Sequence, residues 1–351
     1  MKSAVTLGGV EVQPGERRHI DLPLPPLYTH SAVSMPVHVI NGKRDGPCLF
    51  VSAAVHGDEI NGVEIIRRLL NAKGLRRMHG TLIAVPVVNV YGFVSRSRYL
   101  PDRRDLNRSF PGSGQGSMAS RLADLFMQEI VSRCDYGIDL HTAARGRDNL
   151  PQIRAALEGH PETERLACAF GAPVVIDSGL RDGSLRAEAA QLGLPMLLYE
   201  AGEALRFDEV AIRAGVKGVT RVMRSIGMLP RGRSQRERPR PLITARSVWT
   251  RAPQSGILRA QVPLGAHVEP GDTLGIVADA FGEAEAVVLS DAAGIVIGKT
   301  NLPLVHEGEA LFHIACFPES TGEGAARVVE AFQEEHDPTA DDEAIDEPAL
   351  V

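Results

Sequence analysis

Cysteine is scarce in this sequence and is never closely spaced. The four cysteines are Cys48, Cys134, Cys168 and Cys316, and none belongs to a Cys-x-x-Cys pair. Neither a disulfide framework nor a cysteine-ligated zinc site is therefore expected. We interpret these residues as ordinary reduced thiols and expect a cytoplasmic protein.

Long apolar runs and an excess of positive charge are also missing. No apolar stretch approaches the roughly 18 residues of a transmembrane helix, so no membrane partner is expected. The N-terminus becomes polar too early for the apolar core of a signal peptide. The 38 basic and 44 acidic residues give a net charge of −6, so nucleic acid is not an expected partner. With 44% apolar and 23% charged residues, the 351-residue chain is typical of globular proteins with one large domain or two ordinary ones.

A break in composition divides the chain. Residues 230–241 hold five arginines and three prolines and almost nothing apolar, which predicts an exposed linker over 231–244. A nucleic-acid patch is the alternative, but one short basic run in an acidic chain argues against it. Before the linker, buried-strand patterns alternate with amphipathic helices. The expected strands lie at 48–55, 81–89, 136–142, 172–178 and 195–203, and the expected helices at 59–72, 118–133 and 210–229.

This alternation predicts an α/β domain over 1–230, with a mostly parallel or mixed sheet and helices on both faces. After the linker, short β-rich runs punctuated by Gly and Pro predict a small all-β module over 245–317. Residues 318–351 are expected to form a short helix and an acidic, disordered tail. In open α/β sheets, sites form at the carboxyl ends of the strands, and polar clusters follow several strands here.

Two of these clusters predict a metal site. His56 and Glu59 lie where the first buried strand passes into a helix, and residues three apart at a helix start share one face. His141 lies at the polar end of another strand and completes a two-His, one-Glu set with an open position, as in catalytic zinc sites. The glycine between the first two lets the chain turn tightly. Taken alone, His56 and Glu59 also fit a surface histidine and a glutamate that the helix dipole favours in the first turn. His141 alone also fits a hydrogen-bonded histidine of the core or the sheet edge.

Two further clusters carry charged groups suited to catalysis. Asn107 and Arg108 supply planar donors that match a carboxylate, and Asp105 suits the free nitrogen of a ligand histidine. A loop turn with a surface salt bridge is the other interpretation of this stretch. Glu200 ends an apolar strand and suits a general base beside a metal-bound water. Glu203 competes for that role, but it lies beyond the apolar run, where we expect it to be solvated or to support the site indirectly.

Taken together, the motifs resemble the succinylglutamate desuccinylase/aspartoacylase family of zinc-dependent deacylases, which is related to the zinc carboxypeptidases. They follow the family order H-G-D-E-x-x-G, N-x-x-G-F, S-R-Y, D-L-N-R-x-F-P-G, D-L-H-T and L-L-Y-E. The resemblance covers roughly 35–230 and extends into the β module, as in the bacterial predicted-deacylase branch. Six motifs in the right order are far more than chance agreement would produce.

The resemblance implies a role for each candidate residue. His56, Glu59 and His141 would bind one Zn²⁺ per chain, and residues 1–230 would form the catalytic domain. Arg98 would polarise the scissile carbonyl, with Arg103 and Arg104 as nearby substitutes because the intervening segment is longer than in aspartoacylase-like sequences. Asn107 and Arg108 would hold the substrate carboxylate, and Glu200 would be the general base and acid.

The β module resembles a barrel-sandwich hybrid of the biotinyl/lipoyl type. Residues 287–296, where the two half-repeats meet, contain no lysine, so neither biotin nor lipoate is expected. We expect the module to cover the site or to form a homo-oligomer interface.

The residues and the resemblance both predict hydrolysis of the amide bond of an N-acyl amino acid or similar small carboxylate by metal-activated water. A zinc carboxypeptidase acting on a peptide C-terminus and an esterase are alternatives that would use the same centre. A non-catalytic binding protein on this scaffold would be expected to lose a ligand or the base, and this sequence keeps them all.

Overall fold

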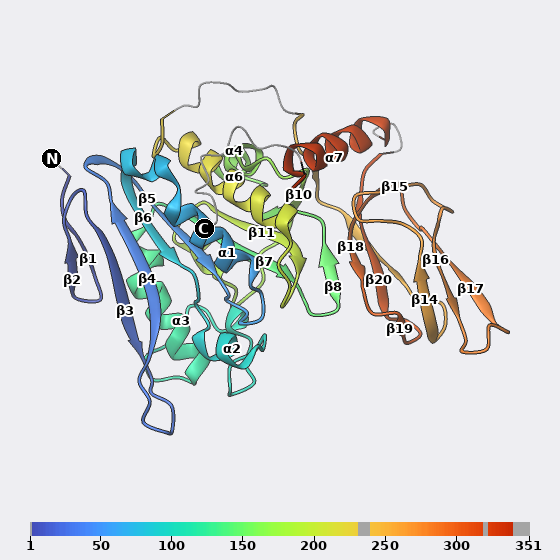
Figure 1. Cartoon of the computed structure of the whole chain (residues 1–351), viewed down its shortest axis with the longest axis horizontal. Helices are drawn as coiled ribbons and strands as arrows, with labels where there is room; N and C mark the ends of the chain where they lie inside the picture. The colour runs from blue at the N-terminus through green and yellow to red at the C-terminus, as the bar shows by residue number, and fades with distance from the viewer. Residues whose placement is uncertain (1, 231–238, 319–321, 340–351) are drawn as a thin grey trace.

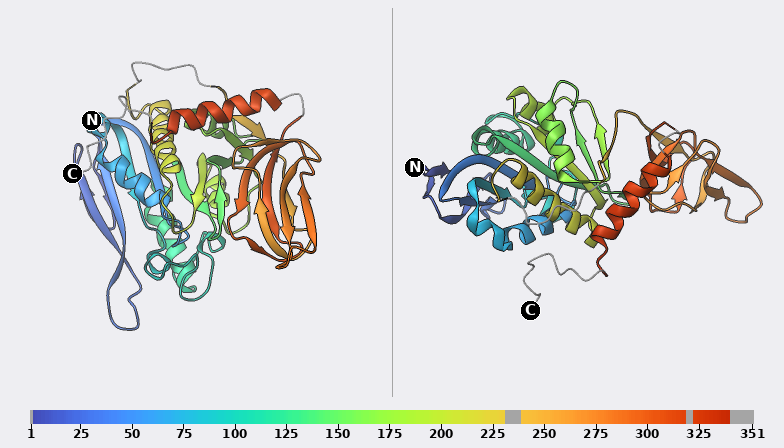
Figure 2. Two further views of the ribbon diagram at one scale, coloured as in Figure 1. Left: turned by 45° about the vertical axis from the view of Figure 1, so that its right-hand side comes forward. Right: turned by 90° about the horizontal axis from the view of Figure 1, so that it is seen from above.

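The computed structural model describes residues 2–230, 239–318 and 322–339. A large α/β body carries a smaller β module beside it, and a C-terminal helix runs across both (Figures 1 and 2). Among the described residues, no helix is long and apolar enough to cross a membrane.

A nine-stranded mixed sheet forms the centre of the body. In order across the sheet, its strands are β12 (Leu242–Thr244), β10 (Val174–Asp177), β9 (Gln152–Ala155), β11 (Met196–Glu203), β7 (Tyr136–Ala143), β5 (Arg44–Ala53), β6 (His79–Val85), β4 (Val33–Asn41) and β3 (Arg17–Leu24). Strands β11, β7, β5 and β6 are parallel to one another. Strands β9, β4 and β3 each run antiparallel to a neighbour, so the sheet is mixed. A separate hairpin of β1 (Val5–Leu7) and β2 (Val10–Val12) packs at the N-terminal edge.

Helices cover both faces of the sheet. The helices on one face are α1 (Asn61–Asn71), α4 (Pro161–Phe170) and α6 (Glu209–Ser225), and those on the other are α3 (Met118–Glu129) and α5 (Leu185–Gln191). Strand β5 packs on both of its faces, which explains the apolar run at 48–51. Val51 packs into the first helical layer, while Phe50 packs into the second. The short helix α2 (Val90–Ser95) and the 3₁₀ turns Lys73–Arg77, Leu106–Arg108 and Val131–Arg133 complete the body.

The expected linker differs from the structure at its C-terminal end. Residues 231–238 lie outside the described residues, but Leu242–Thr244 form β12, which pairs in parallel with β10 at the edge of the main sheet. The apolar pair Leu242 and Ile243 follows the last proline of the basic run and is able to extend a sheet that the body already provides.

Two antiparallel sheets make up the β module. The first contains β13 (Ser247–Arg251), β20 (Ala310–Cys316), β18 (Gly294–Thr300) and β15 (His267–Val268), and the second contains β17 (Glu285–Leu289), β16 (Thr273–Ala278), β14 (Gly256–Ala260) and β19 (Leu304–Val305). A strand of the body, β8 (Arg147–Asn149), pairs with β18 and becomes the fifth strand of the first sheet. The module is therefore joined to the body by a continuous hydrogen-bond ladder.

A shared apolar core also connects the two parts. Leu150 and Ile176 of the body pack with Ile295 and Ile297 of the module. Helix α7 (Gly322–His336) contributes Val329 to this core and Phe332 to the core beneath α6. Helix α7 lies within the segment where a short helix was expected, whereas residues 340–351 of the expected acidic tail lie outside the described residues.

Candidate metal centre and active site

Three adjacent parallel strands, β5, β7 and β11, bring the candidate residues together. His56 and Glu59 follow the end of β5, and His141 lies near the end of β7. Glu200 of β11 is paired in register with His141, so the two side chains emerge on the same face of the sheet. The site therefore forms at the carboxyl end of the sheet, as the strand pattern predicts.

His56, Glu59 and His141 form a buried group whose ligand atoms all lie within 4.8 Å of one another. The two oxygens of Glu59 each face a different histidine. Glu59 Oε1 lies 2.8 Å from Nδ1 of His56, and Glu59 Oε2 lies 2.7 Å from Nδ1 of His141. Both histidines thus present the same ring nitrogen to one point, which is the arrangement that shared binding of a cation requires.

A second carboxylate supports each histidine from behind. Nε2 of His56 lies 3.2 Å from Asp105, and Nε2 of His141 lies 2.7 Å from Asp139. Asp139 is fully buried and also accepts a 2.7 Å hydrogen bond from Ser52. Metal-binding histidines commonly donate their other ring N–H to a carboxylate, so the donor set fits zinc. Asp105 lies where the sequence predicted it, whereas sequence reasoning gave Asp139 no role, although it stands two residues before His141.

Charge in this group is closely balanced. Burial by itself would lower the pKa of His141 and of His56, but the facing carboxylates outweigh it and raise both. Burial would raise the pKa of Glu59, yet the two imidazoles hold it well below its usual range. These raised pKa values favour the protonated histidines, so a cation that binds at Nδ1 would compete with protons.

Arg98 lies against this group. Its guanidinium donates to Glu59 at 3.1 Å and to Asp105 at 3.3 Å. Although burial would lower the pKa of Arg98, these two carboxylates raise it, with a contribution from Glu200. The alternatives Arg103 and Arg104 are exposed, and Arg104 pairs with Asp102 instead. Arg98 is thus the one of the three that the fold brings to the site.

The motif glycines are required by close packing. A Cβ on Gly57 would lie 2.0 Å from the carbonyl carbon of Gly92 in α2, and one on Gly62 would lie 2.7 Å from the Cβ atoms of Ala53 and Leu140. Gly57 lies in the tight turn that we expected, in which the N–H of Glu59 donates to the carbonyl oxygen of His56 at 3.1 Å. Its φ is not in the left-handed region, so close packing is the reason that only glycine fits there. The absence of a side chain lets α2 and α1 approach the strand ends that carry the histidines.

Asn107 and Arg108 have different surroundings. Asn107 is buried, and its Oδ1 accepts a 2.9 Å hydrogen bond from the backbone N–H of Leu185, the first residue of α5. This bond leaves the Nδ2 group of Asn107 as the donor toward a ligand. Arg108 is exposed, and its guanidinium donates to the carbonyl oxygen of Asn107.

The two candidate bases also differ. Glu200 is largely buried and accepts a 3.0 Å hydrogen bond from Asn149, with the Nε of Arg154 4.0 Å away. Glu203 instead accepts from the backbone of Gly146 at 2.8 Å and from Asn301 of the module at 2.9 Å. Glu203 therefore ties the body to the module, while Glu200 points toward the charged site.

Sequence reasoning missed two arginines beside Glu200. Arg154 lies on β9, and its Nε is buried without a hydrogen-bond partner among the described residues. Arg186 lies on α5, where burial and the charge of Arg154 lower its pKa to about 10. Neither belongs to a recognisable motif, and their positions depend on how β9 and α5 pack against β11. Isolated arginines in the sequence carry no signal for such an arrangement.

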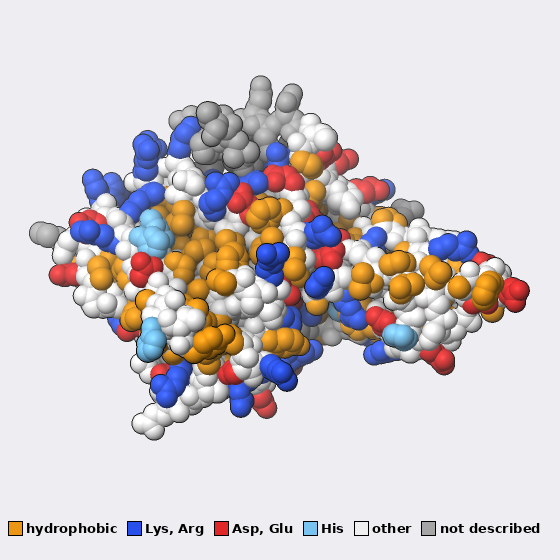
Figure 3. All heavy atoms as spheres, turned by 60° about the horizontal axis from the view of Figure 1, so that its bottom comes forward, with side chains coloured by type: hydrophobic (Ala, Val, Ile, Leu, Met, Phe, Trp, Pro, Cys, Tyr) orange, Lys and Arg blue, Asp and Glu red, His pale blue; other side chains and the backbone are white. Residues whose placement is uncertain are grey.

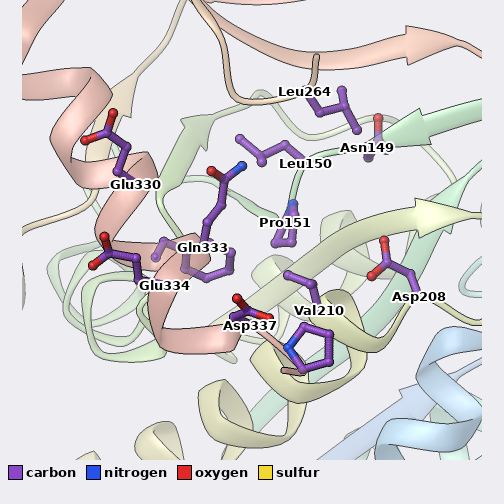
Figure 4. A pocket seen from close by; sticks show the side chains of 12 residues that line it. Asn149, Leu150, Pro151, Asp208, Val210, Leu264, Glu330, Gln333, Glu334 and Asp337 are labelled. Carbon is purple, nitrogen blue, oxygen red and sulfur yellow. The ribbon is translucent and has the colours of Figure 1, made fainter. Parts of the chain in front are cut away.

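A cavity at the junction between body and module is distinct from the candidate site. It encloses about 500 Å³ between α7, the start of α6 and residues 149–151, and it contains none of the three candidate metal ligands (Figure 4). Its wall is apolar at Leu150, Val210 and Phe332 and acidic at Glu330 and Asp337. The candidate active site therefore lies at the strand ends, where the charged groups converge. This cavity lies at the junction between body and module.

Comparison with known proteins places this geometry in a family. Residues 45–226 match the catalytic-domain model described as succinylglutamate desuccinylase/aspartoacylase. The chain belongs to the succinylglutamate desuccinylase/aspartoacylase family. Members of this family are amide-bond hydrolases, and the matched range contains every candidate catalytic and metal-binding residue described above.

Individual relatives agree with this membership. The N-alpha-acetyl-L-2,4-diaminobutyric acid deacetylase of Halomonas elongata is 26% identical over 302 residues, which cover 83% of this chain and 88% of that protein. The product-bound ectoine utilization protein EutE (DoeB) of Ruegeria pomeroyi has a TM-score of 0.75 and 25% identity, covering 86% of this chain and 95% of the other. A succinylglutamate desuccinylase/aspartoacylase of Rhodobacter sphaeroides shares the fold, with a TM-score of 0.76, 24% identity and coverage of 85% and 94%.

Proposed function

We propose that the protein is a zinc-dependent hydrolase that cleaves the amide bond of an N-acyl amino acid or a similar small carboxylate. The observation that carries the proposal is the buried group of His56, Glu59 and His141, in which a separate carboxylate supports each histidine. The similarity to a deacetylase that acts on an N-acetylated amino acid supports the substrate class.

His56, Glu59 and His141 would hold one zinc ion per chain, with Asp105 and Asp139 fixing the orientation of the two imidazoles. The ion would supply Lewis-acid chemistry and lower the pKa of a water molecule to about 7. Arg98 would place a fixed positive charge beside the scissile carbonyl, where negative charge develops.

Glu200 would carry the proton. Its carboxylate lies in register with His141 on the neighbouring strand and is largely shielded from water. From this position it would accept a proton as water attacks and return it to the departing amine. Glu203 is less suited, because both of its oxygens already accept hydrogen bonds that hold the module.

The substrate carboxylate would be held by Asn107 and Arg108, with Arg186 as a further cation. The Nδ2 group of Asn107 is fixed by the bond that its Oδ1 accepts from α5. Arg186 lies on the same helix, near Glu200, and has no ion pair among the described residues. Anchoring the carboxylate would hold the scissile amide in place and reduce the entropic cost of the reaction.

The β module would provide a surface through which copies of the chain associate. Its two antiparallel sheets are consistent with the barrel-sandwich hybrid that the sequence resembles. Apolar side chains lie along the module in Figure 3, and its four-stranded sheet exposes Ile257, Val287, Leu289 and Leu304. We propose that this face forms a homo-oligomer interface in a cytoplasmic enzyme, since exposed apolar patches of this kind commonly mark interaction surfaces.

The proposal is tested by metal analysis and by turnover of a panel of N-acyl amino acids, C-terminal peptides and esters. Replacement Glu200→Gln is expected to retain metal but to lose on the order of 10²–10⁴ in kcat. Glu203→Gln serves as the matched control and is expected to keep turnover within a few-fold. Faster turnover of peptides or esters than of N-acyl amino acids would replace the proposed reaction with one of these alternatives. An active Glu200→Gln variant with an inactive Glu203→Gln variant would move the proton transfer to Glu203.

A further inference from the structure

We propose that Asn149 is a positioning residue for Glu200 and that the β module holds Asn149 in place. This inference rests on the proposed role of Glu200 and assigns the module a direct part in the reaction. The decisive contact is the 3.0 Å hydrogen bond that Nδ2 of Asn149 donates to Oε2 of Glu200. Asn149 is only 8% exposed, so little water competes for this bond.

The other end of the Asn149 amide rests on the module. Asn149 is paired in register with Gly298 of β18. A Cβ on Gly298 would lie 2.9 Å from Oδ1 of Asn149 and 3.2 Å from Cβ of His313. Any larger residue at 298 would therefore push the amide away from its position. The glycine provides the space in which Asn149 can face Glu200.

Gly298 belongs to a row of residues that crosses the first sheet of the module. In register, Trp249 of β13 pairs with His313 of β20, His313 pairs with Gly298 of β18, and Gly298 pairs with Asn149 of β8. His313 and Trp249 are stacked, with ring centroids 4.4 Å apart and planes 4° from parallel. The row thus runs from the aromatic pair of the module to the candidate base of the body.

The middle of this row is rigid and uncharged. His313 is buried, and burial together with Arg154 and Arg147 lowers its pKa to about 3, so its ring is neutral at physiological pH. Arg147 lies over the Trp249 ring, 5.0 Å from its centroid. A neutral ring stacked on Trp249 forms one wall beside Gly298 and adds no charge of its own.

A positioning contact matters for this particular side chain. The terminal torsion of a glutamate is soft, so its carboxylate rotates easily unless a second contact holds it. The bond from Asn149 occupies Oε2, which leaves Oε1 to exchange a proton with the reacting groups. Misplacement of a reacting group by about 1 Å can reduce a rate by up to about 10²-fold.

The chain contains a matched pair for the test. Asn301 donates to Glu203 at 2.9 Å, which is also an asparagine–glutamate bond at the junction between body and module. Asn149→Asp removes the donor to Glu200, and Asn301→Asp removes the equivalent donor to Glu203. Both replacements preserve side-chain size, and each places a carboxylate beside a glutamate.

Steady-state kinetics on the best N-acyl amino acid of the panel should separate the two variants. Asn149→Asp is expected to lower kcat by about 10- to 100-fold with KM within about twofold and zinc content unchanged, whereas Asn301→Asp should retain kcat within about twofold. Gly298→Ala, which acts from the module side, is expected to lower kcat in the same way. Asn149→Ser, which restores a shorter donor, should recover part of the loss.

Equal kcat values for Asn149→Asp and Asn301→Asp would overturn the inference. So would a higher KM at unchanged kcat, because Asn149 would then contact the substrate. If Asn149→Asp fails to fold, Gly298→Ala decides through a crystal structure, in which Glu200 must lose its contact with Asn149. That readout does not depend on turnover. If the unmodified protein hydrolyses no N-acyl amino acid, the proposed function fails, and the crystal structure still decides whether the module positions Glu200.

Discussion

Both nitrogens of each candidate metal-binding histidine face a carboxylate. In each ring Nδ1 faces Glu59 and Nε2 faces another carboxylate, and these carboxylates raise the pKa of both imidazoles. A zinc ion bound at Nδ1 would compete with protons, so zinc affinity should rise with pH until the raised pKa values of His56 and His141 are passed.

Replacing the buried carboxylate behind His141 is the sharper test of this arrangement. Asp139→Asn retains the shape but weakens the acceptor for Nε2, so zinc affinity should fall by about 10- to 100-fold. Titration against a chelator of known affinity measures the change. Ser52→Ala, which removes only the 2.7 Å bond to Asp139, is the control and should have a smaller effect. An unchanged affinity in Asp139→Asn would show that Asp139 does not support the metal ligand.

Arg186 and Arg108 are both candidates for binding the substrate carboxylate, and they are expected to contribute unequally. Arg186 is half-buried near Arg154 and forms no ion pair with a carboxylate of the described residues, whereas Arg108 is exposed. Arg186→Ala should therefore reduce kcat/KM for an N-acyl amino acid by an amount worth roughly 2–5 kcal/mol, mainly through KM. Arg108→Ala should cost less.

The amide of the same amino acid is the control substrate in this comparison. It lacks the negative charge, so it should be a poor substrate and should lose far less from either replacement. Equal turnover of acid and amide by the unmodified protein would contradict carboxylate recognition by both arginines.

At the scale of elements, the sequence predicts the buried strands well and the short polar strands poorly. Residues 48–53 of β5 and 82–85 of β6 are nearly continuous apolar runs, because helices cover both faces of the sheet. Strand β8 has the sequence Arg-Asp-Asn and shows no strand pattern. It is extended because β18 of the distant module provides its hydrogen-bond partners, and such long-range pairing leaves no local signal.

Packing of α2 on the metal-binding loop gives an element-scale prediction. Gly57→Ala would bring a methyl group within 2.0 Å of the backbone of Gly92, so either α2 or the His56 loop must move. Overpacking of this kind costs roughly 1–3 kcal/mol, and zinc affinity should fall with it. Gly74→Ala, where a Cβ meets nothing within 4 Å, is the matched control. Chemical denaturation and zinc titration measure both effects, and equal results for the two variants would exclude close packing as the reason for Gly57.

Asp148 of strand β8 makes the free energy of unfolding depend on pH. Burial, together with Asp208 and Glu203, raises the pKa of Asp148 to about 6, and Lys299 opposes this only partly. A carboxyl group with a raised folded-state pKa contributes stability below its unfolded value of 3.8, and this contribution is lost as pH rises through about 6.

Asp148→Asn should therefore raise the free energy of unfolding at pH 8 by roughly 1–2 kcal/mol, allowing for the partial exposure of the side chain. At a pH near 4 the variant and the unmodified protein should differ little, which provides the internal control. Urea denaturation at the two pH values measures the difference. A variant that is less stable at pH 8 would show that the contact with Lys299 outweighs the crowding of carboxylates.

For the molecule as a whole, the sequence predicts the candidate metal-binding residues better than it predicts the residues that surround Glu200. The metal-ligand motifs are local in sequence and come at strand ends, so their order and spacing are sufficient to find them. Asn149, Arg154 and Arg186 reach Glu200 only because β8, β9 and α5 pack around β11. Their positions depend on tertiary packing, which one sequence does not display.

The same packing makes body and module one cooperative unit, although an Arg/Pro-rich segment lies between them in the sequence. Ladder bonds between β8 and β18, the shared apolar core and helix α7 all cross the junction. Unfolding the module would expose Leu150 and Ile176 of the body to water, which carries a hydrophobic cost. The two parts should therefore unfold together, in a single transition.

Trp249, the chain's single tryptophan, lies in the module, while most helices lie in the body. Tryptophan fluorescence and far-UV circular dichroism should therefore give coincident denaturation curves. Leu274→Ala in the module core should lower both midpoints together, at a cost of roughly 2–5 kcal/mol. Asp291→Ala, at an exposed position of the same module outside the proposed interface, should shift both by less than about 0.5 kcal/mol. If Leu274→Ala moves only the fluorescence curve, the module unfolds independently, and its ladder to β8 does not couple it to the body that carries Glu200.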